Sequence, residues 1–116
     1  MALPPVERDE GQAHVEATIS FLSTEAGGRN QGVSSGYRPN HHFGGDDGLW
    51  DAMHIYPDKI RVEPGETVRA LLYFPAPERH ARRFFVGFRF KVQEGGRVVG
   101  EGEVTKVGLG ILQCKE

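Results

Sequence analysis

The sequence predicts an all-β protein, a small antiparallel β-barrel of six strands, and three observations support this prediction. Apolar and polar residues alternate with a period of two in segments 14–21, 67–74 and 84–92, the pattern of strands with one buried face. The 16 glycines and 7 prolines fall largely between such segments, where they favour turns. A helical stripe of useful length is found in no segment.

The first half of the chain contains three of the expected strands. The first begins at His14 and places Val15, Ala17, Ile19 and Phe21 on its buried face. A loop rich in glycine follows, from residue 23 to residue 35. The next two strands are expected at 37–43, where Pro39 indicates an edge or a bulge, and at 49–56, after the turn 44–48.

The second half contains the strongest pattern. A strand at 67–74 is followed by one at 84–92, which we expect to direct one row of side chains into the core: Phe84, Val86, Phe88, Phe90 and Val92. The pair Gly95-Gly96 predicts a tight hairpin. The last strand follows it, and its glycines indicate bulging or close packing at a barrel corner. Six such strands close most economically into a barrel, which removes exposed edges.

The length and composition favour a single soluble domain. The chain has 116 residues, of which 38% are apolar and 26% charged. We expect a flexible N-terminal tail over residues 1–12, a barrel over 13–108 and a C-terminal tail over 109–116. The formal net charge of −2 gives no overall attraction to nucleic acid or to an anionic membrane.

The cysteine count and the N-terminus indicate a cytoplasmic protein. Cys114 is the only cysteine, which excludes an internal disulfide and fits a reducing compartment. The first residues lack the apolar core of a secretory signal. No apolar run approaches the ~20 residues needed to cross a bilayer, so we expect no membrane association.

Five short motifs follow one another along the chain in a specific order. They are Glu25–Arg29, Gly36–Pro39, Glu63–Glu66, Glu94–Gly100 and Val104–Val107. In order and spacing they resemble the third, C-terminal domain of elongation factor Tu, from about His14 to Val107. The resemblance implies a six-stranded barrel that stands alone here, without the GTPase domain. In the complete factor this barrel contacts the T stem of aminoacyl-tRNA and the nucleotide exchange factor.

The chain also departs from that family. None of its four lysines follows a glycine, so the phosphate-binding loop GxxxxGK[ST] is missing and we expect no bound nucleotide. The loop 30–35 and the segment 40–43 lack the family's usual residues, among them its aromatic side chains. The run 79–83 is basic where the family is usually acidic, and residues 108–116 extend past the family's usual end.

Seven basic residues are candidates for binding a partner or RNA: Arg29, Arg38, Arg97, Lys106, Arg79, Arg82 and Arg83. The resemblance implies that the first four lie near the surface that meets tRNA. Alternatively, an arginine beside a Gly-Gly pair holds the turn by hydrogen-bonding nearby carbonyls. The last three form the sharpest charge cluster, which either contacts phosphates or is a solvated loop paired with acidic residues.

Catalytic chemistry is not predicted. A metal site has one candidate set of ligands: His41, His42, Asp46, Asp47, Asp51 and His54. Adjacent residues on a strand point to opposite faces, however, so His41 and His42 cannot share one ion without a bulge. Cys114 lacks the loop that accompanies a catalytic nucleophile. We therefore expect no metal, no cofactor and no enzymatic activity.

Three hypotheses about function remain, in order of preference. The first is a non-catalytic module that docks to a protein partner in a translation-related context. The second is a weak RNA-binding module for a tRNA-like stem, which basic loops could contact through phosphates. The third is a metal-dependent enzyme that uses the His41/His42 region.

Overall fold

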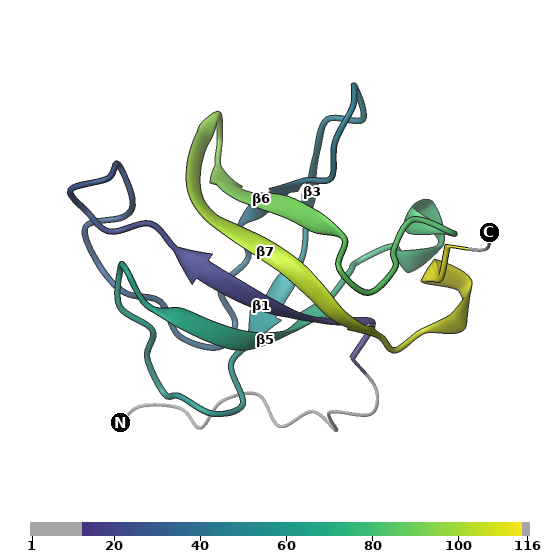
Figure 1. The fold of residues 1–116 in the computed structure, drawn as a ribbon, viewed down its shortest axis with the longest axis horizontal. Helices are drawn as coiled ribbons and strands as arrows, with labels where there is room; N and C mark the ends of the chain where they lie inside the picture. Colours follow the sequence, from purple (N-terminus) through teal and green to yellow (C-terminus); the bar gives the residue numbers. More distant parts are fainter. Residues whose placement is uncertain (1–12, 115–116) are drawn as a thin grey trace.

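The structure, a computed structural model, describes residues 13–114 and consists of one strongly bent antiparallel sheet (Figure 1). Its strands are β1 (Val15–Phe21), β2 (Asn40–His42), β3 (Leu49–Asp51), β4 (Met53–Ile55), β5 (Thr67–Tyr73), β6 (Arg89–Glu94) and β7 (Arg97–Val107). Two short 3-10 helices, η2 (Pro77–His80) and η3 (Gly110–Leu112), are the only helical segments among the described residues. The all-β prediction is therefore confirmed.

The sheet is nearly closed into a barrel, as predicted. Its strand order is β3-β2-β6-β7-β1-β5-β4, so the two outermost strands follow each other in the chain. Only Ala52 separates β3 from β4. The backbone N–H of His54 donates to the carbonyl of Tyr37 at 2.8 Å, and that of Gly36 donates to the carbonyl of His54 at 2.8 Å. These bonds join β4 to the segment before β2 and bring the two ends of the sheet together.

The number of strands differs from the prediction. Residues 13–114 form seven strands, because the segment 49–56 forms two strands that pair with different neighbours. β3 pairs with β2, whereas β4 pairs with β5. The expected strand at 37–43 is also shorter, since only residues 40–42 are paired as β2. The segment before β2 instead supplies the backbone bonds that close the barrel.

The core is filled by the inward rows of the long strands. Val15, Ala17 and Ile19 of β1 are fully buried, as the alternation predicted. Gly102 of β7 faces the ring of Phe90, and a Cβ atom there would lie only 2.2 Å from Cζ of that ring. The register between β6 and β7 shifts after Val92, which leaves Val99 as an extra, buried residue. The bulge and the close packing expected at the glycines of this strand are both present.

The segment 84–92 is only partly a strand. β6 begins at Arg89, and a turn closed by the Phe88 N–H to Phe85 carbonyl bond precedes it. Phe84 and Phe90 are buried as predicted, but Val86 is 67% exposed, so its predicted core position is wrong. Gly87 has a φ of +97°, which breaks the alternation just before β6.

The segment after β7, expected as a tail, packs on the barrel over its described residues 109–114. Leu112 of η3 is fully buried in the core. A parallel bridge joins Phe84 and Gln113, and the backbone N–H of Phe84 donates to the carbonyl of Leu112 at 2.9 Å. The expected N-terminal tail and residues 115–116 lie outside the described residues. Within the described part, no helix has the length and apolar character to cross a membrane.

Candidate functional site

The seven basic candidates lie in different parts of the barrel. Arg29 and Arg97 meet beside the tip of the β6–β7 hairpin, whereas Arg79, Arg82 and Arg83 belong to η2 and the segment that follows it. In Figure 1 the hairpin tip lies at the upper left and η2 at the right, at opposite ends of the molecule. The fold therefore keeps the charge run 79–83 apart from Arg29 and Arg97, as in the two groups of candidates drawn from the sequence.

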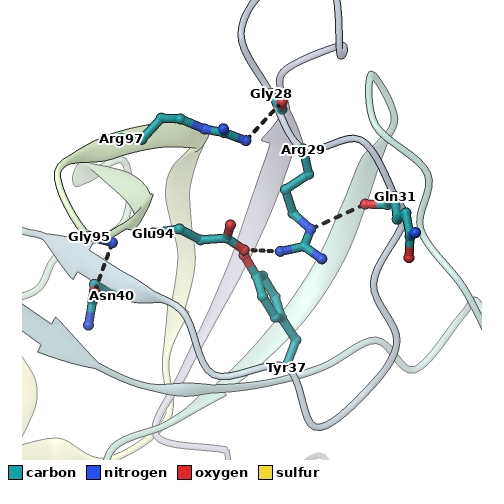
Figure 2. Close-up of polar contacts among 8 residues, drawn as sticks. All are labelled: Gly28, Arg29, Gln31, Tyr37, Asn40, Glu94, Gly95 and Arg97. Atoms are coloured by element: carbon teal, nitrogen blue, oxygen red, sulfur yellow. Dashed lines mark hydrogen bonds and ion pairs between the residues drawn. The ribbon is translucent and has the colours of Figure 1, made fainter.

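At the hairpin end, Arg29 is held by the protein itself (Figure 2). Its guanidinium forms an ion pair with Glu94 at the end of β6, and its Nε donates to the carbonyl of Gln31 at 3.2 Å. The hydroxyl of Tyr37 donates to the same Glu94 oxygen at 2.6 Å, and the Arg29 guanidinium lies 5.2 Å from the centre of the Tyr37 ring. The guanidinium of Arg29, which the resemblance implies lies near the tRNA-binding surface, is therefore already bonded to groups of the protein itself.

The same cluster sets the ionisation of Glu94. Burial by itself raises the pKa of this carboxyl group, but the hydrogen bonds from Tyr37 and Arg29 outweigh it, so the net pKa is lowered. Burial and the hydrogen bond to Glu94 both raise the pKa of the Tyr37 phenol. The cluster therefore holds a carboxylate, a guanidinium and a neutral phenol at neutral pH, a stable structural arrangement.

Arg97 fixes the loop 23–35 to the hairpin. Its Nη2 donates to the carbonyl of Gly28 at 3.1 Å, as Figure 2 shows. Gly28 itself lies against the backbone, since a Cβ atom there would be 2.2 Å from the carbonyl oxygen of Leu22. Any larger residue would displace the loop. The geometry at Arg97 is that of the structural alternative, in which an arginine beside the glycine pair bonds a neighbouring carbonyl.

Arg38 and Lys106 stand apart from both clusters. Arg38 is exposed, and its Nη2 lies 3.9 Å from the sulfur of Met53. Lys106 is exposed near the end of β7, opposite Glu16 of β1 in the register. Neither residue joins a group of other basic side chains in the described structure.

Arg83 has a structural role at the other end of the barrel. It forms an ion pair with Asp47 of the β2–β3 turn, and its guanidinium lies 5.3 Å from the ring centre of Phe43 and 6.0 Å from that of Trp50. Asp47 also accepts a hydrogen bond from Nε1 of Trp50 at 2.8 Å. These contacts tie the β2–β3 turn to the segment after η2, while Nε of Arg83 is buried without a hydrogen-bond partner in the described structure.

Arg79 and Arg82 differ from Arg83. Both are exposed, and within residues 13–114 neither side chain has a hydrogen-bond or ion-pair partner. Arg82 has a φ of +61° and is the only described non-glycine residue with a positive φ. Its backbone N–H donates to the carbonyl of Ile111 at 2.8 Å, which holds this conformation. The two guanidinium groups remain available to a ligand.

Exposed apolar side chains gather near these two arginines. Three of the five large apolar residues that are exposed among the described residues belong to segments 82–86 and 109–114, which bond to each other. They are Phe85 at 48%, Val86 at 67% and Ile111 at 52% exposure. We call Arg79, Arg82, Phe85, Val86 and Ile111 together the η2–η3 surface. Isolated exposed apolar residues are ordinary, but such a grouping indicates a contact site.

A buried histidine pair lies inside the barrel. Nε2 of His41 is 2.7 Å from Nε2 of His54, and both side chains are fully buried. Nδ1 of His41 lies 3.0 Å from the Trp50 carbonyl, and Nδ1 of His54 lies 2.9 Å from the Tyr56 hydroxyl. Since a carbonyl can only accept, His41 donates from Nδ1 and accepts at Nε2. His54 then donates from Nε2, and Tyr56 donates to its Nδ1.

This assignment requires both imidazoles to be neutral. Burial lowers the pKa of His41 to about 4, although its bond to the Trp50 carbonyl opposes this. Burial also lowers the pKa of His54 well below its ordinary value, and His41 adds to that effect. A proton added to His41 would put two N–H groups against each other at the Nε2 contact, and a proton added to His54 would occupy the Nδ1 that accepts from Tyr56, so the neutral pair is a structural element of the core at neutral pH.

Removing the Tyr56 hydroxyl tests this directed chain. In the variant Tyr56→Phe, Nδ1 of His54 keeps its buried position but loses its donor. We expect a loss of about 1–3 kcal/mol in the free energy of unfolding, the usual cost of a buried unsatisfied acceptor. Urea denaturation at neutral pH measures this loss. A loss below about 0.5 kcal/mol would show that the hydroxyl does not satisfy His54.

The metal hypothesis finds no support in the geometry of the described residues. His41 points into the core, whereas the adjacent His42 lies on the outer face of the sheet and is half-buried, as the strand argument predicted. No group of three or more potential ligands from His, Cys, Asp and Glu converges within residues 13–114. Cys114 is a free, half-buried thiol.

Several of these features were missed by sequence reasoning. The sequence pattern places His54 and Tyr56 in a single strand and indicates His54 only as a metal ligand, so it does not predict the hydrogen bonds of His54 to His41 and Tyr56. The alternation of Asn40, His41 and His42 around one inward position was the only available signal for the buried histidine. The exposure of Val86 and Ile111 had no signal, because it depends on the pairing of two segments that are distant in sequence.

The fold and these surfaces define a small, nearly closed antiparallel barrel with one structural arginine cluster and one exposed surface of mixed basic and apolar character. No protein-family model matches the chain.

Proposed function

We propose that this chain is a non-catalytic binding module, similar in build to the third domain of elongation factor Tu, that docks to a protein partner in a translation-related, cytoplasmic setting. The observation that supports docking is the η2–η3 surface, where Phe85, Val86 and Ile111 are exposed on two bonded segments. Covering them would remove apolar surface from water, which is the main driving force of protein association. The ordered resemblance of five motifs supports the translation setting.

RNA is less well suited to this barrel than a protein partner. At the hairpin end, the Arg29 and Arg97 side chains already bind Glu94 and the carbonyl of Gly28. A duplex stem requires several cations that are free to contact phosphates. The chain as a whole has a net charge of −2, which opposes binding to a polyanion. Protein docking is therefore the function that the geometry supports best.

The proposed function is tested by affinity capture from a cell lysate with a matched pair of variants. The test variant is Phe85→Ser/Val86→Ser/Ile111→Ser. The control is Leu49→Ser/Ile60→Ser, which removes the other two exposed large apolar side chains, 41% and 82% exposed. We expect a protein that is retained by the wild type and the control, is lost from the test variant, and binds directly once purified.

Two outcomes would contradict docking through this surface. One is a set of captured proteins that is the same for the test variant and the wild type. The other is an enriched RNA that disappears after nuclease treatment or at moderate salt, with no protein retained after either treatment. That second result would favour the tRNA-stem alternative, because phosphate contacts are strongly weakened by salt.

A further inference from the structure

We infer that the η2–η3 surface binds an acidic peptide segment that also carries apolar side chains. This inference rests on the proposed function, since it names the chemistry of the partner. Its basis is the combination of two unpaired guanidinium groups, at Arg79 and Arg82, with three exposed apolar side chains on adjoining segments. Neither feature alone would specify a ligand of this kind.

The local charge is opposite in sign to that of the whole chain. Segments 76–86 and 109–114 contain Arg79, Arg82 and Arg83 against the single acid Glu78, and Asp47 pairs with Arg83, so three positive and two negative groups give a local formal charge of +1. The complete chain has a net charge of −2. Such a basic region on an acidic protein attracts carboxylates during encounter and fixes the orientation of an acidic partner.

Most arginines elsewhere in the described barrel are already paired; Arg38 is an exception, but it lies outside the segments of the η2–η3 surface. Arg29 binds Glu94, and Arg83 binds Asp47. Arg69 pairs with Asp58 and Glu16, while Arg89 pairs with Glu103. The guanidinium groups of Arg79 and Arg82 therefore retain their full capacity for forked bonds to a carboxylate.

The backbone of Arg82 adds a second line of evidence. For any residue with a Cβ atom, a backbone conformation with a φ of +61° is unfavourable by about 1–2 kcal/mol. The turn would be better served by glycine or asparagine if its shape were the only requirement. A strained position that nevertheless carries a long, unpaired cation is typical of a site where the side chain has a binding role.

The apolar residues distinguish a peptide from a polyanion. Nucleic-acid interfaces are polar and strongly basic, and they require many phosphate contacts. Here two free arginines accompany Phe85, Val86 and Ile111. Protein–protein interfaces typically combine apolar and charged side chains, with aromatic and arginine residues at the centre of the contact. A segment with alternating acidic and apolar side chains would satisfy both parts of the surface.

The ligand chemistry is tested with a random peptide library displayed on phage and selected on the immobilised full-length protein at low salt. We expect the enriched peptides to contain an excess of Asp and Glu together with Leu, Ile, Val or aromatic residues. Their dissociation constants are then measured by fluorescence polarisation. Arg79→Glu should weaken binding by about tenfold or more, because an attractive contact becomes a repulsive one.

Two control variants keep this measurement specific. Lys59→Glu changes the net charge by the same amount as Arg79→Glu. Lys59 pairs with Glu66 just before β5, whereas η2 follows the other end of that strand, so this variant should leave peptide binding nearly unchanged. Arg82→Gly removes both the guanidinium and the backbone strain. We expect it to raise the melting temperature by a few degrees while it weakens peptide binding. A residue with a purely structural role would not show this opposition.

Several results would overturn the inference. They are enrichment of basic or uncharged peptides, binding that survives in Phe85→Ser/Val86→Ser/Ile111→Ser, absence of any enriched peptide, or a duplex RNA stem whose binding is lost in Arg79→Glu. If the lysate capture yields a surface-dependent protein whose contact region is not acidic, docking stands and the acidic-peptide inference fails. If no surface-dependent protein is captured, docking itself fails.

Discussion

Lowering the pH from about 7 to about 4.5 should destabilise this protein strongly, mostly above the pH range in which its carboxylates are protonated. Three buried histidines cause this effect: His41, His54 and His80. Burial lowers the pKa of His41 to about 4, and burial together with the nearby charge of Arg83 lowers the pKa of His80 to about 4. Burial, together with His41, also lowers the pKa of His54 well below its ordinary value.

The direction of the effect follows from proton uptake on unfolding. An unfolded histidine has a pKa of about 6.5, so between about pH 6.5 and pH 4 the unfolded chain binds protons that the folded protein excludes. The contribution of the neutral histidines to the free energy of unfolding is therefore fully present above this pH window and is lost as the pH falls through it. Each histidine contributes a slope of up to about 1.4 kcal/mol per pH unit, and three contribute up to about 4.

That slope is large compared with the ordinary stability of a small domain, about 5–15 kcal/mol. The carboxylates act mainly at lower pH. Asp58, for example, has a pKa lowered by its hydrogen bond to Arg69. We expect urea unfolding midpoints to fall steeply between pH 6.5 and 4.5 and to be nearly constant between pH 7 and 8. A flat profile down to about pH 5 would show that the histidines are solvated or already protonated.

The variant His80→Leu refines this test. Nδ1 of His80 is buried without a hydrogen-bond partner in the described structure, and its ring packs 4.5 Å from Phe74 and 4.9 Å from Trp50, centre to centre. An apolar side chain avoids the cost of burying that nitrogen, about 1–3 kcal/mol. We expect a higher free energy of unfolding at neutral pH. Its dependence on pH should also be weaker, by the contribution of one histidine proton.

Truncating Phe84 should cause the second large effect, a loss of about 3–5 kcal/mol in the free energy of unfolding. Phe84 is fully buried, and its ring packs 5.1 Å from Phe43 and 5.6 Å from Phe74, centre to centre. Its backbone also holds the C-terminal segment, through bonds with Leu112 and Cys114. Phe84→Ala should therefore destabilise both the core and the η2–η3 surface, as measured by urea denaturation and by hydrogen exchange at residues 110–114.

The neighbouring residues provide the controls for Phe84. Phe85→Ala and Val86→Ala remove side chains that are 48% and 67% exposed, so each should change stability by no more than about 0.5–1 kcal/mol. If Val86→Ala lowered the free energy of unfolding as much as Phe84→Ala, Val86 would be a core residue, as the alternating sequence pattern predicted. Equal, small costs at all three positions would contradict the buried position of Phe84.

The long strands could be predicted from the sequence because their physical signal is local. In β1 and most of β7, residues alternate between the core and solvent, and the period of two records this directly, whereas the last four residues of β5 are all buried. The Gly95-Gly96 hairpin was equally readable, because few other residue pairs fit so tight a turn. The opposite directions of His41 and His42 followed from strand geometry alone.

The candidate site was only partly predictable. The cluster Arg79–Arg83 was evident as a charge run, but its division into a paired Arg83 and an unpaired Arg79 and Arg82 was not. That division depends on Asp47, which is far away in sequence. Likewise, the pairing of Arg29 with Glu94 requires two loops that only the closed sheet brings together.

The sequence by itself determined the all-β class, the barrel, most of the buried rows and the absence of a nucleotide-binding loop, since composition and periodicity express these properties residue by residue. Tertiary structure alone decided the seventh strand, the buried His41–His54 pair and the exposure of Phe85, Val86 and Ile111. These features depend on contacts between distant segments, and such contacts form only when closure of the sheet fixes which groups must satisfy one another.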